Sequence, residues 1–189
     1  RRMQRLAILF ALLVSALTFT GGASAALRTG VADDLGRYPD QSVWFLDSLG
    51  ELGMTENRIS VGFDPAAPTT IPDQWQLDLY VPLATLRGVR PVFSVSPTRA
   101  RAVAENPNAP VLYAQYVALL ARRYPTVKDF IIGNEPNQPR FWQPQFGSSG
   151  RNVSAASYYR LLAASYDAWR RSLGGKPIPL GIDGVHVEG

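Results

Sequence analysis

The chain has 189 residues, a formal net charge of +4, one histidine and no cysteine. The lack of cysteine excludes disulfides and thiolate chemistry, and the single histidine excludes a multi-histidine metal site within the chain. The positive charge gives no reason to expect nucleic acid as a partner, because most of the excess lies in the first 25 residues.

These first residues have the pattern of a secretory signal peptide. Three arginines precede an apolar run at 6–19, and a cleavage site of the A-x-A type follows at 23–25. The run is shorter than the roughly 20 residues of a membrane-spanning helix, although an uncleaved anchor is the alternative. Three of the 19 basic residues and none of the 15 acidic ones lie in this segment, so the remainder has a net charge of +1. We therefore expect residues 1–25 to be removed and residues 26–189 to be exported, with no membrane attachment after cleavage.

The exported part shows strands alternating with helices. The pattern predicts five strands, at 27–32, 57–63, 91–95, from Phe130, and at 179–182. It predicts four helices between them. The first is capped by Asp40 and ends at Gly53, the second covers about 76–86, the third begins at Pro110, and the fourth is capped by Ser154 and ends at Gly174. Strands that alternate with helices in this way are typical of a parallel sheet built from βαβ units.

Two architectures fit such an alternation. A five-stranded open sheet would be finished within this length, whereas a (β/α)8 TIM barrel takes about 250 residues and would be about half made. No glycine-rich fingerprint follows the first predicted strand, so the main marker of nucleotide-binding open sheets is missing. We therefore predict an α/β fold that consists of the first four to five βα units of a (β/α)8 TIM barrel.

The most informative stretch surrounds the fourth predicted strand. Residues 130–132 form a short apolar run of the kind that is buried on both faces of a sheet, and Gly133 follows without a side chain. Pro136 cannot continue a central strand, so the strand must end at Asn134 or Glu135. An amide and a carboxylate are thus expected at the carboxyl end of a strand, where the chemistry of barrels and open α/β sheets takes place. The alternative interpretation is a polar turn without a catalytic role.

This pattern resembles the retaining glycosidases of clan A, the (β/α)8 group that includes cellulase-like family 5 and xylosidase-like family 39 enzymes. Those enzymes carry Asn-Glu at the end of the fourth strand, often followed by proline, and usually an arginine on the second strand. Here Asn134-Glu135-Pro136 and Arg58 match these features. The resemblance covers about residues 26–189, which would be the N-terminal part of a catalytic domain.

The resemblance implies a secreted O-glycosyl hydrolase that acts on a poly- or oligosaccharide and needs no cofactor or metal. Retaining hydrolysis uses one carboxylic acid to protonate the leaving oxygen and a second carboxylate about 5 Å away to attack the sugar. Glu135 would be the acid and later the base. The family's nucleophilic glutamate lies on the seventh strand, beyond residue 189, so this chain alone is expected to be inactive.

The same resemblance implies substrate-binding roles for three residues. Asn134 would hydrogen-bond the sugar 2-OH, and Arg58 would hold the missing nucleophile ionised. Trp142, in the loop after the motif, could stack on a sugar face or could anchor its loop by packing on the barrel rim.

Further candidates have both structural and functional interpretations. Asp33 and Asp34 are either turn residues or sugar ligands, and His186 is either a subsite contact or a structural histidine. Trp75 is more readily explained as a residue beside a helix start, and Glu188 lies on the wrong strand for a nucleophile. The alternative to an enzyme is a non-catalytic carbohydrate-binding protein on the same barrel, which the residue on the seventh strand would distinguish. The pattern predicts neither the sugar nor the oligomeric state.

Overall fold

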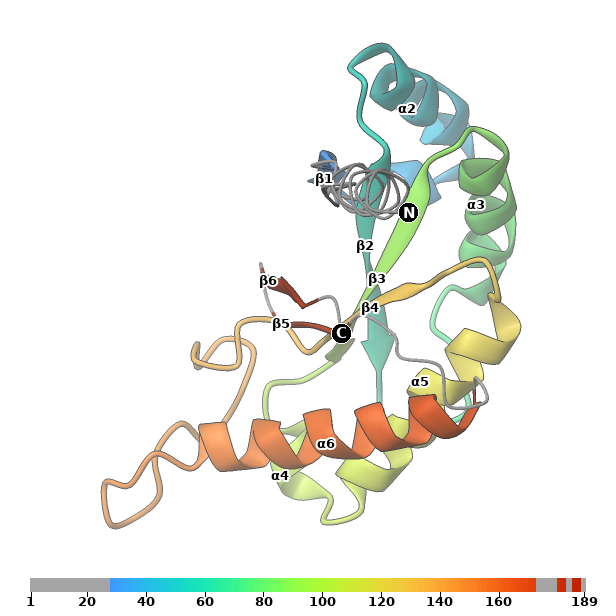
Figure 1. Cartoon of the computed structure of the whole chain (residues 1–189). Coiled ribbons are helices and arrows are strands. Elements are labelled where there is room, and N and C mark those ends of the chain that lie inside the picture. Colours follow the sequence, from blue (N-terminus) through green and yellow to red (C-terminus); the bar gives the residue numbers. More distant parts are fainter. Residues whose placement is uncertain (1–27, 173–179, 183–184, 188–189) are drawn as a thin grey trace, which may run out of the picture.

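The computed structural model describes residues 28–172, 180–182 and 185–187 (Figure 1). The predicted signal peptide and Glu188 lie outside the described residues. Within them, no helix is long and apolar enough to cross a membrane.

Strands and helices alternate as predicted. The elements are β1 (Gly30–Ala32), the 3-10 helix η1 (Leu35–Arg37), α2 (Pro39–Glu51), β2 (Glu56–Phe63), α3 (Gln74–Leu86), β3 (Arg90–Pro97), α4 (Ala102–Glu105), α5 (Ala109–Arg123), β4 (Asp129–Ile132), α6 (Ser154–Ser172), β5 (Leu180–Ile182) and β6 (Val185–Val187). The sequence pattern missed η1, α4 and β6, because elements of three or four residues are too short to show a period.

The sheet contains six strands in the order β1-β2-β3-β4-β5-β6. The first five are parallel and β6 is antiparallel to β5. In open doubly wound sheets the strand order reverses and helices cover both faces. Here the order does not reverse, and α2, α3, α5 and α6 form an arc along one side of the curved sheet (Figure 1). The fold is therefore a partial (β/α)8 barrel, as predicted, and the open-sheet alternative is wrong.

The two faces of the strands differ because successive side chains point in opposite directions. Most outer side chains of β2, β3 and β4 are apolar and almost completely buried: Ile59, Val61, Phe63, Phe93, Val95, Phe130 and Ile132. The buried Asn57 of β2 is polar, and its carboxamide donates to the Tyr80 hydroxyl of α3 at 2.8 Å. The Phe130 ring packs edge to face against Phe93 at 5.6 Å and against Trp169 of α6 at 4.4 Å. The hydrophobic core thus lies between the sheet and the helices.

The inner face carries polar side chains, beginning with a ladder of ion pairs at the amino ends of the strands. Glu56 of β2 pairs with Arg28 at 3.0 Å and with Arg90 of β3 at 3.3 Å. Arg90 also pairs with the buried Asp129 of β4. One continuous network therefore links β2, β3 and β4 with the residue at position 28, just before β1.

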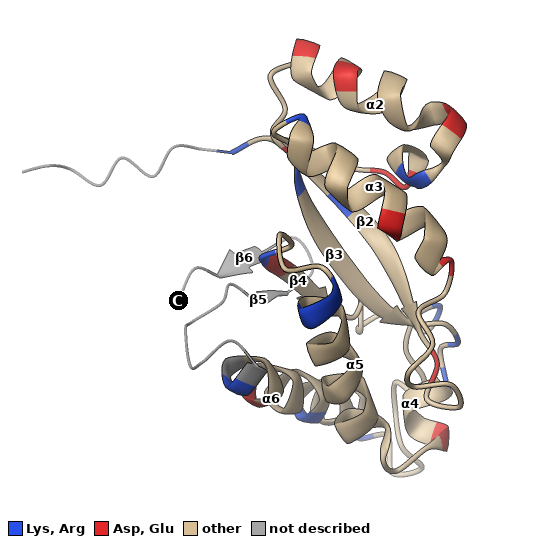
Figure 2. Cartoon of the chain, turned by 90° about the vertical axis from the view of Figure 1, so that its right-hand side faces the viewer, with Lys and Arg blue, Asp and Glu red and all other residues tan. Residues whose placement is uncertain are grey.

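Acidic and basic residues are spread along the helices (Figure 2), and some of them form a second set of ion pairs. Asp47 of α2 pairs with Arg87 at the end of α3 at 2.6 Å, and Asp78 of α3 pairs with Arg123 of α5 at 2.7 Å. Exposed pairs of this kind stabilise a protein by only about 0–1 kcal/mol each. The apolar contact with the sheet, rather than these pairs, holds the helices in place.

Two predicted helix caps are wrong. Helix α2 begins at Pro39 with Tyr38 as its N-cap, so Asp40 lies inside the first turn. Proline is favoured at the first helical position because the missing N–H would have no partner there. Helix α6 begins at Ser154 itself, and the carboxamide oxygen of Asn152 accepts the hydrogen bond from the Ala155 amide at 3.0 Å.

We predict that Phe93→Ala lowers the free energy of unfolding by about 3–5 kcal/mol, because it removes a fully buried ring from the centre of the core. Urea unfolding measures the change. Leu86→Ala is the control, since Leu86 is 82% exposed and its truncation is expected to change stability by no more than about 0.5 kcal/mol. Similar losses in both variants would contradict the assignment of the core.

Candidate active site

The Asn-Glu-Pro stretch lies just beyond the carboxyl end of β4. The strand ends at Ile132, two residues before the first predicted end, because the backbone turns at Gly133 with φ of 77°. Glu135 also has a left-handed backbone, with φ of 38°. Such conformations at non-glycine residues cost on the order of 1–3 kcal/mol and cluster at functional sites, where the surrounding structure holds them.

The turn at residues 133–135 forms a backbone corner after β4, and Arg58 holds the inner side of this corner. Its guanidinium donates hydrogen bonds to the carboxamide oxygen of Asn134 at 2.7 Å and to the hydroxyl of Ser94 at 2.9 Å. The three residues come from β2, β3 and the end of β4. Two predicted site residues are therefore in direct contact, and the carboxamide NH2 of Asn134 is the group that can donate elsewhere.

The outer side of the corner is held by two tyrosines. The Gly133 amide donates to the Val95 carbonyl at 2.7 Å and to the Tyr113 hydroxyl at 3.3 Å, and that hydroxyl donates to the same carbonyl at 2.6 Å. Burial raises the pKa of Tyr113 well above its ordinary value, so the phenol keeps its proton. The Tyr158 hydroxyl of α6 donates to the Ile132 carbonyl at 2.8 Å. Neither tyrosine was among the predicted site residues.

Glu135 and Trp142 differ in their exposure. Glu135 is exposed on the turn, and its main-chain carbonyl accepts a hydrogen bond from the Gln138 amide at 2.8 Å. Trp142 is only 2% exposed and packs edge to face against Tyr158 at 5.8 Å. A buried ring presents no face to a sugar, so the stacking role of Trp142 does not fit this structure. The alternative, a loop anchor, does.

Asp33 and Asp34 follow β1 and serve as turn residues. Asp33 accepts a hydrogen bond from the Leu35 amide at 2.7 Å, and Asp34 accepts one from the Ser60 amide at 2.6 Å. Together with Arg58 they line a small cavity of about 100 Å³ between the end of β1 and the middle of β2. These contacts fit the structural interpretation of the two aspartates, and their position beside Arg58 puts them at the edge of the candidate site.

The remaining candidates are not brought to this site by any observed contact. Trp75 lies in the first turn of α3 and is 57% exposed. His186 lies in β6, opposite Gly181 of β5, and its side chain is outside the described part of the structure. In the described part there is no group of three or more His, Cys, Asp or Glu side chains that could hold a metal ion.

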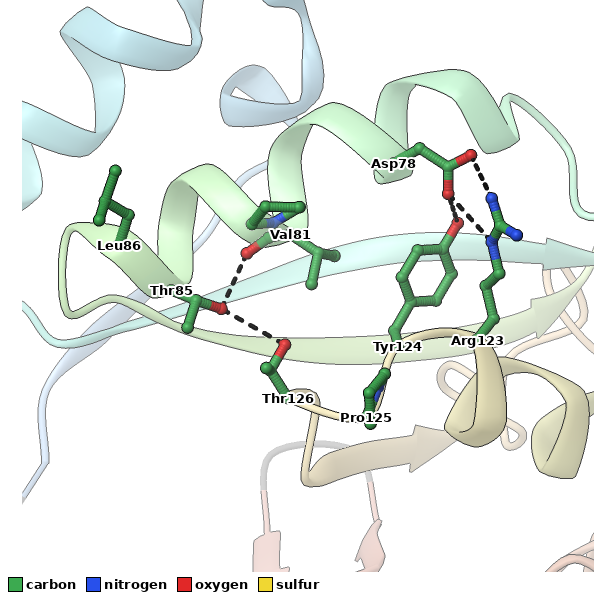
Figure 3. A pocket seen from close by; sticks show the side chains of 9 residues that line it. Asp78, Val81, Thr85, Leu86, Arg123, Tyr124, Pro125 and Thr126 are labelled. Atoms are coloured by element: carbon green, nitrogen blue, oxygen red, sulfur yellow. Dashed lines mark hydrogen bonds and ion pairs between the residues drawn. The ribbon is translucent and has the colours of Figure 1, made fainter.

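A much larger groove lies at the opposite end of the strands. It has a volume of about 610 Å³ and separates α3 from the end of α5 and the turn that leads into β4 (Figure 3). Asp78 on its wall pairs with Arg123 and accepts a hydrogen bond from Tyr124 at 2.9 Å, and the bond from Arg123 holds the pKa of Asp78 below its ordinary value. None of the predicted site residues lines this groove.

Solved structures of beta-glucosidases have a similar fold. The beta-glucosidase from Thermotoga maritima in complex with cyclophellitol matches with a TM-score of 0.59 and 15% identity over 84% of this chain and 49% of that chain. A beta-glucosidase from Exiguobacterium marinum matches with a TM-score of 0.56 and 16% identity over 76% of this chain and 36% of that chain. The chain thus spans half or less of the length of these enzymes.

These similarities establish the fold: the chain forms part of a (β/α)8 barrel and matches about half or less of the beta-glucosidase structures. One matching structure is a family 1 enzyme from Thermotoga maritima, with a TM-score of 0.58 and 15% identity over 82% of this chain and 47% of that chain. Identities this low do not separate one glycosidase family from another, so the likeness to families 5 and 39 stays a prediction. No protein-family model matches the sequence, and a comparison of the sequence with curated proteins found no match.

We predict that Gly133→Ala destabilises the protein more than Gly88→Ala does. Both glycines have a left-handed backbone, with φ of 77° and 72°, so both substitutions introduce strain of roughly 1–2 kcal/mol. A Cβ at Gly133 would also lie 3.3 Å from the Tyr158 ring, whereas nothing lies within 4 Å of a Cβ at Gly88. Thermal unfolding of the two variants measures the difference. Equal shifts would mean that the corner is not crowded.

Proposed function

We propose that the protein is a secreted retaining glycoside hydrolase that cleaves O-glycosidic bonds of a poly- or oligosaccharide. The observation that carries the proposal is the joint position of Asn134 and Glu135 at the carboxyl end of β4, with Arg58 of β2 bonded to Asn134. In (β/α)8 barrels the active site is built at that end of the strands. The shared fold with beta-glucosidases supports the same assignment.

Glu135 is assigned as the acid and base of the reaction. Glu135 is exposed on the turn, as a residue that acts on a bound glycoside must be. In the first step it would give its proton to the leaving oxygen while a second carboxylate, about 5 Å away, attacks the sugar. In the second step the ionised Glu135 would take a proton from the attacking water. The carboxylates of Asp33 and Asp34 accept hydrogen bonds from backbone amides, and we do not assign either of them as the nucleophile. As in the family that the sequence resembles, we place the nucleophile on a later strand, beyond residue 189.

Asn134 and Arg58 are assigned to the sugar and to the nucleophile. Because Arg58 occupies the carboxamide oxygen of Asn134, the amide NH2 is oriented to donate to the sugar 2-OH, a contact that strengthens in the transition state. The planar guanidinium of Arg58 can serve several acceptors at once, which suits it to hold a neighbouring carboxylate ionised. Trp142 has no sugar-binding role in this proposal and instead supports the loop.

Export is the other part of the proposal, and it depends on the N-terminal sequence. The basic start, the apolar run and the A-x-A site at 23–25 support the proposal that the chain is cleaved after residue 25 and exported. A polysaccharide substrate fits that location because it is too large to enter a cell intact. The chemistry assigned to these residues needs carboxyl groups alone and no cofactor.

We predict the effect of Glu135→Gln in the full-length protein, meaning a parent protein that includes the later strands of the barrel. The substitution should slow hydrolysis of glycosides with poor leaving groups by about 10²- to 10⁴-fold, which is the contribution of general acid catalysis. Glutamine keeps the shape but has no acidic proton to give. An activated aryl glycoside leaves without that proton, so its cleavage should slow much less, and a burst of aryl product should precede slow turnover. Steady-state and pre-steady-state rates on the two substrates measure the effect.

The matched control is Glu51→Gln, which changes the last residue of α2, on the outer side of the sheet, and should leave both rates unchanged. Equal losses on both substrates in Glu135→Gln would show that Glu135 is not the acid. A wild-type protein that binds oligosaccharides without hydrolysing them would support the alternative, a carbohydrate-binding protein.

A further inference from the structure

We propose that Tyr113 and Tyr158 are positioning residues that hold the backbone corner at Gly133 and thereby aim Glu135 at the leaving oxygen. The inference rests on the proposed function, and it adds two residues from the outer helices to the site.

The corner needs support because the sheet ends just before it. The Gly133 amide makes the last hydrogen bond from β4 to β3, and beyond it the backbone is left-handed at Gly133 and at Glu135. Asn134 is held from the inner side through its carboxamide, by Arg58. That contact fixes a side chain, whereas the direction in which Glu135 leaves the sheet depends on the backbone at Ile132 and Gly133.

Tyr158 holds this backbone from α6. Its hydroxyl donates to the Ile132 carbonyl at 2.8 Å, and its ring lies where a Cβ at Gly133 would come within 3.3 Å. The same ring packs against the buried Trp142, which also borders Gly133. Hydrogen bond and ring together restrict the peptide units on both sides of the corner.

Tyr113 holds the corner from α5. It is completely buried, and its hydroxyl accepts from the Gly133 amide at 3.3 Å while it donates to the Val95 carbonyl at 2.6 Å. The hydroxyl therefore bridges the end of β3 to the start of the turn. Helices α5 and α6, which follow the adjacent strands β3 and β4, thus each provide a tyrosine hydroxyl that hydrogen-bonds the backbone of the corner from the outer side of the barrel.

The expected effect follows from the sensitivity of catalysis to geometry. A displacement of about 1 Å in a reacting group can lower the rate about 10²-fold, so the loss of one anchor is expected to lower kcat about 10-fold. The loss should fall mainly on glycosides with poor leaving groups, because these need the proton from Glu135. KM should change little, because the tyrosines do not contact substrate.

The test uses Tyr113→Phe and Tyr158→Phe in the full-length protein. Phenylalanine keeps the ring and removes only the hydroxyl. The matched control is Tyr116→Phe, because Tyr116 is also a completely buried tyrosine of α5, but its hydroxyl donates to the Gly62 carbonyl at the end of β2 at 2.8 Å. Tyr113 and Tyr116 are completely buried and Tyr158 is half-buried, and each variant loses one hydroxyl that donates to a backbone carbonyl, so general destabilisation is common to the three.

Two readouts distinguish positioning from stability. The first is the ratio of the kcat loss on glycosides with poor leaving groups to the kcat loss on an activated aryl glycoside. The same ratio is measured in the Glu135→Gln background, where removal of the hydroxyls should cause no further selective loss. The second is amide hydrogen exchange of the peptide that contains residues 133–135, which should become faster in the two test variants and not in Tyr116→Phe.

A selective loss on poor leaving groups together with faster exchange at the corner would support the proposal. Equal losses on both substrates, or unchanged exchange in the test variants, would overturn it. A wild-type protein that hydrolyses no glycoside would contradict the proposed function instead, and the exchange data would still decide whether the two tyrosines hold the corner.

Discussion

The hydrogen bond from the Gly133 amide to the Val95 carbonyl, 2.7 Å long, is the contact on which the arrangement of the candidate site depends. It closes the ladder between β3 and β4, and it fixes the point from which the chain turns. The left-handed backbone at Gly133 then sends Asn134 and Glu135 beyond the carboxyl edge of the sheet instead of along it. Glycine adopts this conformation without strain, and a Cβ at this position would lie 3.3 Å from the Tyr158 ring, which is tighter than an ordinary van der Waals contact. Strand end, turn and motif are therefore one structural unit.

The alternation of side chains along each strand separates stability from chemistry. Ile59 and Val61 of β2 are buried under the helices, whereas Arg58, on the opposite face of the same strand, reaches Ser94 and Asn134. A strand shifted by one residue would place the arginine in the hydrophobic core and the isoleucine in the site. The apolar outer face thus determines the register, and the register determines which polar side chains meet at the carboxyl edge.

Much of this arrangement could be predicted because it depends on local patterns. Apolar runs that end in Gly, Pro or polar residues gave the order of the elements, and the same rule placed Asn134 and Glu135 at a strand end. For Trp142 the sequence left both sugar stacking and a packed loop anchor open, and it could not decide between them, since the burial depends on a ring contact with Tyr158 of α6 that no spacing in the sequence specifies. Tyr113 shows the same limit: the sequence does not say which carbonyl its hydroxyl meets, and that contact is what links the residue to the site.

The two ends of the inner face use arginine in different ways. At the amino ends of the strands, Arg90 pairs with the carboxylates of Glu56 and Asp129, so charge is balanced within the sheet. At the carboxyl ends, Arg58 donates hydrogen bonds to the neutral side chains of Ser94 and Asn134, and these bonds hold its guanidinium in place. A positive charge held in this way favours the ionised form of a carboxyl group that comes near it. A nucleophile must be ionised and an acid must not be, so Arg58 suits the nucleophile of the proposed reaction. The neutral amide of Asn134 is accordingly the partner that connects Arg58 to the turn that carries Glu135.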